Sequence, residues 1–161
     1  MEQITLDATD IQLLDQLQND ASLSNQALAT LIHISPPTCL RRVKRLRELG
    51  LIEREIAVLS VDKLQQVAGH GVCAMVEITL DRQDQTALEA FEKRVADDDA
   101  VQQCYRVSPG PDFCLVVHCA HMPDYLALSQ RLFTADANVR NVKTFFSIQR
   151  SKFGARVPLP L

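Results

Sequence analysis

SPPTCLRRVKRLRELG, residues 35–50, is the most informative segment of this 161-residue chain. Ser35 is a good N-cap, because its hydroxyl can accept a hydrogen bond from an N–H group of the first helical turn. Pro36 suits the first helical position, where its fixed φ is already helical, and Gly50 suits the position just beyond the last turn. The segment therefore predicts one short helix with a defined beginning and end.

This helix is expected to have two different faces. Apolar residues recur at helical spacing and should form one buried stripe, made of Leu40, Val43, Leu46 and Leu49. The opposite face then carries polar and basic side chains: Thr38, Arg41, Arg42 and Arg45. Such a helix suits a nucleic-acid groove, although a basic face that only meets solvent is the plainer alternative.

The net charge of −3 hides an uneven distribution. Residues 1–35 hold five acidic side chains and no Lys or Arg, whereas residues 36–54 hold six basic and two acidic side chains. The remaining residues, 55–161, hold eleven basic and thirteen acidic side chains. Because local charge sets the field that a phosphate backbone meets, the concentration of positive charge on the predicted helix favours DNA binding.

Two more helices are predicted before the basic one. Asp7 is a good N-cap for a helix that ends near Asn19, and Ser24 can start a second helix. A short turn at His33 then leads into the basic helix. Three helices in about fifty residues, the last two tightly joined, are typical of a helix-turn-helix domain, and the β-forming segment 50–59 that follows indicates an extended segment or wing.

The second part of the chain begins with a polar connector over residues 61–71 and then alternates with a period of two. The pattern predicts strands and helices in the order strand 72–80, helix 84–96, strands 101–107 and 113–119, helix 123–133 and strand 139–148. This β-α-β-β-α-β order is typical of a ferredoxin-like unit, an antiparallel sheet with two helices on one face.

We therefore expect an α+β protein with two domains: a winged helix-turn-helix domain over residues 1–60 and a ferredoxin-like domain over residues 61–161. The sheet face that the helices leave open has the apolar candidates Met75, Val116 and Phe145. Since a large exposed apolar face usually marks an interface, we expect self-association through the sheet.

Composition indicates the compartment. The sequence contains no run of about 18 apolar residues, so a membrane-spanning helix is not expected. The acidic start of the chain does not resemble a secretion leader. The five cysteines have no C-x-x-C spacing and indicate free thiols in a reducing environment. A cytoplasmic protein without a membrane partner is expected.

The two parts together resemble the Lrp/AsnC family of bacterial and archaeal transcription regulators, from Leu6 to about Lys152. The most specific motif is Ile34-Ser35-Pro36-x-x-Cys39-Leu40-x-Arg42-Val43-x-x-Leu46, which is similar to the recognition helix of the family. The resemblance implies a DNA-binding first domain and a second domain that dimerises and often binds an amino acid. It also implies assembly as a dimer, a tetramer or an octamer (a tetramer of dimers), with the effector bound where dimers meet.

The effector loop of the family has a Val-Ser/Thr-Gly-x-x-Asp-hydrophobic pattern, which resembles Val107-Ser108-Pro109-Gly110-Pro111-Asp112-Phe113. Here the glycine is displaced by one position, and the two prolines remove N–H donors. Asp112 is a candidate partner for an α-ammonium group, and the backbone at Gly110 for an α-carboxylate. Without the resemblance, this segment would be read as only a hairpin turn.

Further effector residues are expected around this loop. Apolar walls favour a leucine- or methionine-like ligand and would come from Tyr105, Val107, Phe113 and Phe146. A neighbouring subunit would supply Thr134 and Asp136, and the resemblance associates three other positions with effector response: Met122, Phe146 and Ser147.

For DNA, we expect Thr38, Arg41 and Arg42 to reach base edges or adjacent phosphates. Arg45 and Arg47 would lie nearer the backbone. Ser35 and Pro36, at the start of the helix, would hold a phosphate on the N-terminal N–H groups. A dimer presents two such helices, so the double-stranded operator should be roughly palindromic, with half-sites about one helical turn or a multiple apart.

The sequence leaves two other classes of function to consider, an enzyme and a protein-binding sensor. The sequence has no persuasive Ser/His/Asp or Cys/His arrangement and no phosphate-binding glycine loop, so an enzyme is not expected. His118 and Cys119 invite a metal site, but strand alternation puts them on opposite faces, so no metal cofactor is expected. The other rival is an amino-acid sensor whose helical domain binds a protein, and a steep salt dependence of DNA binding would distinguish the two.

Overall fold

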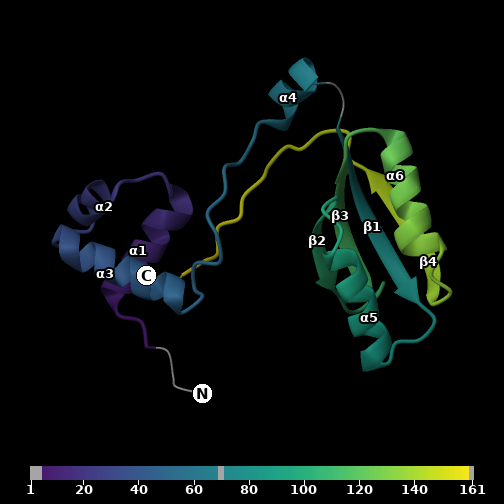
Figure 1. Ribbon diagram of the computed structural model, residues 1–161, viewed down its shortest axis with the longest axis horizontal. Coiled ribbons are helices and arrows are strands. Elements are labelled where there is room, and N and C mark those ends of the chain that lie inside the picture. Colours follow the sequence, from purple (N-terminus) through teal and green to yellow (C-terminus); the bar gives the residue numbers. More distant parts are fainter. Residues whose placement is uncertain (1–4, 69–70, 160–161) are drawn as a thin grey trace. The chain divides into compact units, whose positions relative to one another are not determined.

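The computed structural model describes residues 5–68 and 71–159. The chain forms two compact units, shown in Figure 1. The helical unit comprises the chain up to Val58 together with the tail from Lys152 onward, and the sheet unit comprises Leu59–Ser151. The C-terminal tail, which the sequence-based division assigned to the second domain, thus makes its contacts with the helices of the first.

The helical unit contains α1 (Ala8–Asn19), α2 (Asn25–Leu31) and α3 (Pro36–Glu48). Each of the three predicted N-caps accepts a hydrogen bond from its first turn, with Asp7 bonded to the N–H of residue 10 at 2.9 Å. The helices pack around one small core, made of Leu13, Leu28, Ala29, Cys39, Val43 and Leu46. The helix-turn-helix architecture is therefore confirmed.

The predicted buried stripe of α3 was wrong at its first position. Leu40 is 59% exposed, whereas Cys39 is completely buried beside Val43 and Leu46. Either Leu40 or Cys39 forms a helical stripe with Val43 and Leu46. The tight three-helix core accepts the smaller cysteine, which behaves as a small apolar side chain. The corrected phase also moves Arg42 from the solvent face to the edge of the core, where it is only half-exposed.

The segment after α3 differs in part from expectation. Residues 53–60 are extended and form no strand. A short helix, α4 (Val61–Ala68), replaces most of the connector expected over residues 61–71. Ser60 caps it, because its hydroxyl accepts a hydrogen bond from the N–H of Lys63 at 3.4 Å. Gly69 and His70 of that connector lie outside the described residues.

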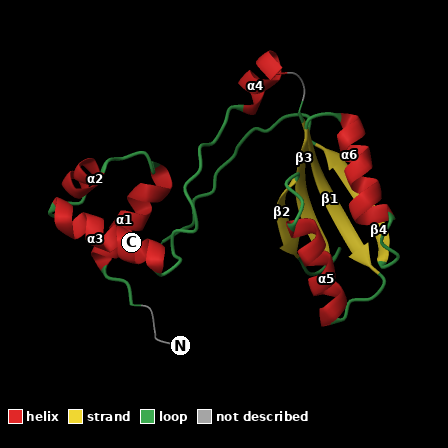
Figure 2. Cartoon of the chain, in the orientation of Figure 1, coloured by secondary structure: helices red, strands yellow, loops and turns green. Residues whose placement is uncertain are grey.

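The sheet unit has the predicted order of elements: β1 (Val72–Leu80), α5 (Gln85–Ala96), β2 (Val101–Arg106), β3 (Phe113–Cys119), α6 (Met122–Ser129) and β4 (Val139–Phe146). One π-helical turn, η1 (Gln130–Thr134), extends α6. The strands form an antiparallel sheet in the order β2-β3-β1-β4, and Figure 2 shows α5 and α6 against it. The ferredoxin-like fold is thus confirmed.

Alternate residues of the sheet have different surroundings. One set packs against α5 and α6 and is buried, including Ala74, Val76, Ile78 and Leu80 of β1. The other set forms the outer face, where Met75 lies directly between Val116 of β3 and Phe145 of β4 in the strand register. The three apolar candidates therefore share one row across three strands.

No helix in the described parts of the chain is long and apolar enough to cross a membrane.

Candidate DNA interface and effector loop

A buried carboxylate connects α1 to α3. Asp10 is only 2% exposed, and its two oxygens accept hydrogen bonds from Arg42 at 2.8 Å and from Arg45 at 3.1 Å. Arg42 also donates to Asp7 at 2.7 Å, and Arg45 donates to the carbonyl of Thr5 at 3.1 Å. Two of the arginines expected to contact DNA therefore hold the first and third helices together.

The charges of this cluster reinforce each other. The hydrogen bond from the Arg42 guanidinium holds the pKa of Asp7 below its ordinary value of 3.8. The same bond, followed by the bond to Asp10, raises the pKa of Arg42. Both shifts favour the charged forms of Asp7 and Arg42, and the attraction between these two groups helps to fix the position of α3 on α1.

Other members of the expected DNA-binding set lie at the two ends of α3. At the start, the hydroxyls of Ser35 and Thr38 share a hydrogen bond of 2.8 Å, and Pro36 occupies the first helical position. At the end, Arg47 forms an ion pair with Glu55 in the extended segment. The N-terminal turn is therefore well ordered, and Arg47 ties the helix end to the segment that follows it.

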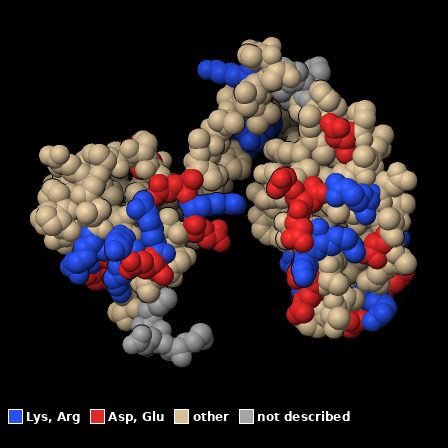
Figure 3. Space-filling view, in the orientation of Figure 1, with Lys and Arg blue, Asp and Glu red and all other residues tan. Residues whose placement is uncertain are grey.

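The solvent face of α3 has a different basic set. Arg41 is exposed and makes no hydrogen bond or ion pair with any described residue. Lys44 is also exposed, and its Nζ lies 3.7 Å from Glu48 Oε1. Figure 3 shows basic side chains gathered over α3, with acidic ones among them. A hollow of about 350 Å³ adjoins this region, lined by Thr5, Asp7, Asp10, Arg41, Arg42 and Arg45.

In the sheet unit, the expected effector loop is folded back on itself. The N–H of Val107 donates to the carbonyl of Asp112 at 3.0 Å, and Asp112 Oδ2 accepts from the N–H of Leu80 at 2.7 Å and from Gln83 at 3.3 Å. Gly110 has φ +122°, a conformation that side chains with a Cβ rarely adopt. The carboxylate of Asp112 is therefore held at the end of β1.

The expected apolar walls of the loop lie on opposite sheet faces. Tyr105 is exposed on the outer face, where its hydroxyl donates to Gln103 at 3.2 Å. Phe113 is completely buried under the helices and stacks on Phe91, with 4.7 Å between the two ring centroids. The alternation of apolar residues does not show which face of the sheet the helices cover. The sequence therefore did not reveal that Tyr105 and Phe113 lie on opposite faces. Of the loop residues between them, Ser108 is exposed and Pro111 half-buried.

The remaining expected effector residues form two separate groups. Thr134 and Asp136 lie just before β4, near the loop end of the sheet, where the carboxylate of Asp136 is paired with Arg94. The second group consists of Met122, Phe146 and Ser147, and in the strand register Phe146 faces Ala74, far from Leu80 at the loop end. Ala74 and Leu80 are six strand residues apart, a distance of roughly 20 Å, so a single amino acid cannot contact both groups of one chain.

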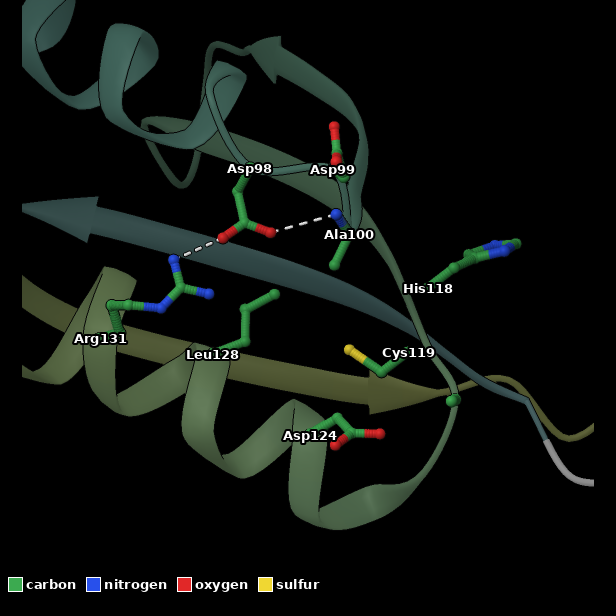
Figure 4. Close-up of a pocket in the computed structure, with 9 residues that line it drawn as sticks. Asp98, Asp99, Ala100, His118, Cys119, Asp124, Leu128 and Arg131 are labelled. Carbon is green, nitrogen blue, oxygen red and sulfur yellow. Dashed lines mark hydrogen bonds and ion pairs between the residues drawn. The ribbon is translucent and has the colours of Figure 1, made fainter.

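Another hollow, of about 420 Å³, lies at the sheet end opposite the loop (Figure 4). Asp98 and Arg131 pair across it at 2.5 Å, while the side chain of His118 points away from that of Cys119. The two side chains thus diverge as strand alternation predicts. Within the described residues, no three His, Cys, Asp or Glu side chains are grouped as metal ligands would be.

The two units match two known domain types. Residues 6–53 match a family of winged helix-turn-helix DNA-binding domains, and residues 73–157 match the Lrp/AsnC ligand binding domain. The fold and its site regions thus define a DNA-binding regulator with a ligand-binding domain.

Individual relatives agree with this class over nearly the whole chain. A leucine-responsive regulatory protein of Rhizobium meliloti is 32% identical over 156 residues, which cover 97% of this chain and 97% of the relative. An HTH-type transcriptional regulator of Haemophilus influenzae is 32% identical over 148 residues, which cover 92% of this chain and 86% of the relative. A transcriptional regulator of Neisseria meningitidis, solved in complex with L-Met, has a TM-score of 0.81 and 26% identity, covering 97% and 98% of the two chains.

The chain belongs to the Lrp/AsnC family of transcriptional regulators. Its function is DNA-binding regulation rather than catalysis.

Proposed function

We propose that this regulator binds double-stranded DNA through the solvent face of α3, with Arg41 at its centre. Arg41 is the arginine of the helix that is exposed and has no partner among the described residues, and a guanidinium can donate to both acceptors of a guanine edge. Thr38 and Lys44 would contact neighbouring bases or phosphates. Ser35 and Pro36 open the helix at the end where N–H groups attract a phosphate.

In this proposal, the main role of Arg42 and Arg45 is to hold α3 in place on α1. Their bonds to Asp10 support this role, since a guanidinium that satisfies a buried carboxylate is not available to a base edge without leaving that carboxylate uncompensated. Arg45, the more exposed of the two, would add a phosphate contact.

The DNA proposal is tested by fluorescence anisotropy with duplexes that the wild-type protein selects from a random library. Arg41→Ala should weaken binding at least tenfold at moderate salt without changing the melting temperature. Arg54→Ala is the matched control, because Arg54 is an exposed arginine outside α3. If Arg41→Ala binds as tightly as the wild type, or if binding does not weaken with salt, the assignment is wrong.

We propose further that the ligand of the sheet unit is a free amino acid with an apolar side chain, such as leucine or methionine. The α-ammonium group would be bound by Asp112, and the N–H of Gly110 would contact the α-carboxylate. The names of two relatives support the chemistry, since one is leucine-responsive and one was solved with L-Met. The roughly 20 Å of strand between Leu80, at the loop end, and the position of Phe146 favours a ligand that binds between two copies of the chain.

Isothermal titration calorimetry with leucine, methionine and asparagine tests this proposal. Leucine or methionine should release heat with the wild-type protein, and Asp112→Asn should weaken that binding at least tenfold. Because Asp112 also bonds to Leu80, the variant's melting curve must be recorded alongside. Absence of heat with every amino acid at millimolar concentration would remove the effector claim.

Self-association completes the proposal. The row of Val116, Met75 and Phe145 supports pairing through the outer sheet face, first as a dimer and then as an octamer built of four dimers. Two copies of α3 would then read a roughly palindromic site. The described cysteines are all free thiols, which supports a cytoplasmic location.

A further inference from the structure

Leu40 is unusual among the residues of α3. It lies in the second turn of the helix and is 59% exposed, although leucine is the kind of residue that the core of this small unit requires. The core uses Cys39 in its place. An apolar side chain thus stands on the solvent face of a helix whose other exposed residues are mainly charged.

Its neighbours on the helix are the groups that attract DNA. Arg41 follows it directly, Lys44 lies one turn later, and Pro37 lies one turn earlier, all exposed. The front half of a recognition helix is the part that contacts base edges. A side chain at this position, with the cations of Arg41 and Lys44 beside it, would be pressed against the floor of the major groove.

The major groove has one apolar feature, the 5-methyl group of thymine. Polar side chains of α3 can bond to donor and acceptor atoms, but only an apolar side chain gains from covering this methyl group. We propose that Leu40 is a specificity-determining residue, which recognises thymine by contact with its 5-methyl group. This inference rests on the proposed binding of DNA by α3.

The test replaces each thymine of a selected duplex in turn by deoxyuridine, which lacks only that methyl group. Burial of one methyl group favours binding roughly fourfold, so the wild-type protein should lose about that factor at one or two positions per half-site. Leu40→Ala should bind the thymine and uracil duplexes equally. Leu31→Ala, which changes another exposed leucine of the helical unit, should keep the wild-type discrimination.

The possible outcomes distinguish failure of the role of Leu40 from failure of DNA binding by α3. If the wild type selects specific duplexes but no uracil substitution weakens binding, or if Leu40→Ala shows the same loss as the wild type, the role of Leu40 is wrong and DNA binding stands. If Leu40→Ala changes the sedimentation coefficient and leaves thymine discrimination intact, Leu40 contacts a second copy of the chain instead. If no duplex is selected, both proposals fail.

Discussion

Asp10 has an environment that is rare for a carboxylate. It is almost completely buried, and each of its oxygens faces an arginine of α3. Removing one member of a buried ion pair usually costs more than the pair contributes, because the remaining charge is left without compensation. The position of α3, and with it the direction of Arg41, therefore depends on a residue that cannot itself touch DNA.

Asp10→Asn should destabilise the helical unit. A fully buried pair broken on one side loses about 3–5 kcal/mol, and since Arg42 and Arg45 keep some contact with water, we expect about 2 kcal/mol here. Urea unfolding followed by circular dichroism measures the difference. Glu48→Gln is the control, because it removes an exposed carboxylate of α3 and should change stability by less than about 0.5 kcal/mol. Equal losses in the two variants would contradict the account.

Asp7 gives the same cluster a pH dependence. Its pKa is lowered in the folded protein, so its contribution to stability is present above the ordinary pKa of 3.8 and is lost as the pH falls through the lower, folded value. Asp7→Asn should therefore unfold more readily at neutral pH and show a smaller loss of stability below pH 3.8. Urea midpoints across that range check this. An acid response as large as that of the wild type would exclude Asp7 as a cause.

At the scale of elements, the order of helices and strands followed from the sequence because helical and alternating periods differ clearly. The sequence did not decide which face of α3 is buried, because Leu40 and Cys39 each complete an apolar stripe with Val43 and Leu46. Only the space available in the three-helix core decides between them.

The candidate site was predictable to a smaller extent. The loop around Asp112 was located correctly along the chain, as the end of a hairpin, but the burial of Phe113 depends on which sheet face the helices cover. The pairing of Asp10 with Arg42 joins residues 32 positions apart, so no local pattern reveals it. One signal was present: Asp10 stands one turn before Leu13, on the apolar side of α1.

The C-terminal tail is an element that the sequence did not reveal at all. Arg156 forms an ion pair with Asp15 of α1 at 2.5 Å, and the N–H of Val157 donates to Gln18 at 2.9 Å. Both acceptors belong to the helix that Asp10 connects to α3. The tail thus helps to hold α1, the helix to which α3 is bound through Asp10.

Truncation after Ser151 should loosen α1 specifically. Loss of the ion pair and the hydrogen bond should cost about 1 kcal/mol, so amide hydrogens of α1 should exchange about fivefold faster in a hydrogen-exchange experiment. Amide hydrogens of β1 should keep their wild-type rates, and Arg156→Ala should give a smaller effect on α1 alone. Unchanged exchange in α1 would mean that the tail contributes nothing to the helical unit.

Across the whole molecule, our proposal is that pairing through the outer sheet face brings two copies of α3 to the DNA. Met75→Glu places a charge in the middle of the row formed by Val116 and Phe145. Burying that charge against a second copy would be costly, so the variant should sediment as an 18.0 kDa monomer where the wild type does not. Ala90→Glu, on the exposed side of α5, should leave assembly unchanged. A wild-type protein that is itself monomeric at micromolar concentration would refute the interface.

Hydroxyl-radical footprinting of the wild-type protein on a selected duplex distinguishes DNA binding by two copies of α3 from binding by one, because it reports how many segments of the duplex are protected and where. Two copies of α3 predict two protected patches related by a dyad, with centres about one helical turn or a multiple of it apart. A single protected patch without symmetry, at a protein concentration that saturates the duplex, would contradict the account.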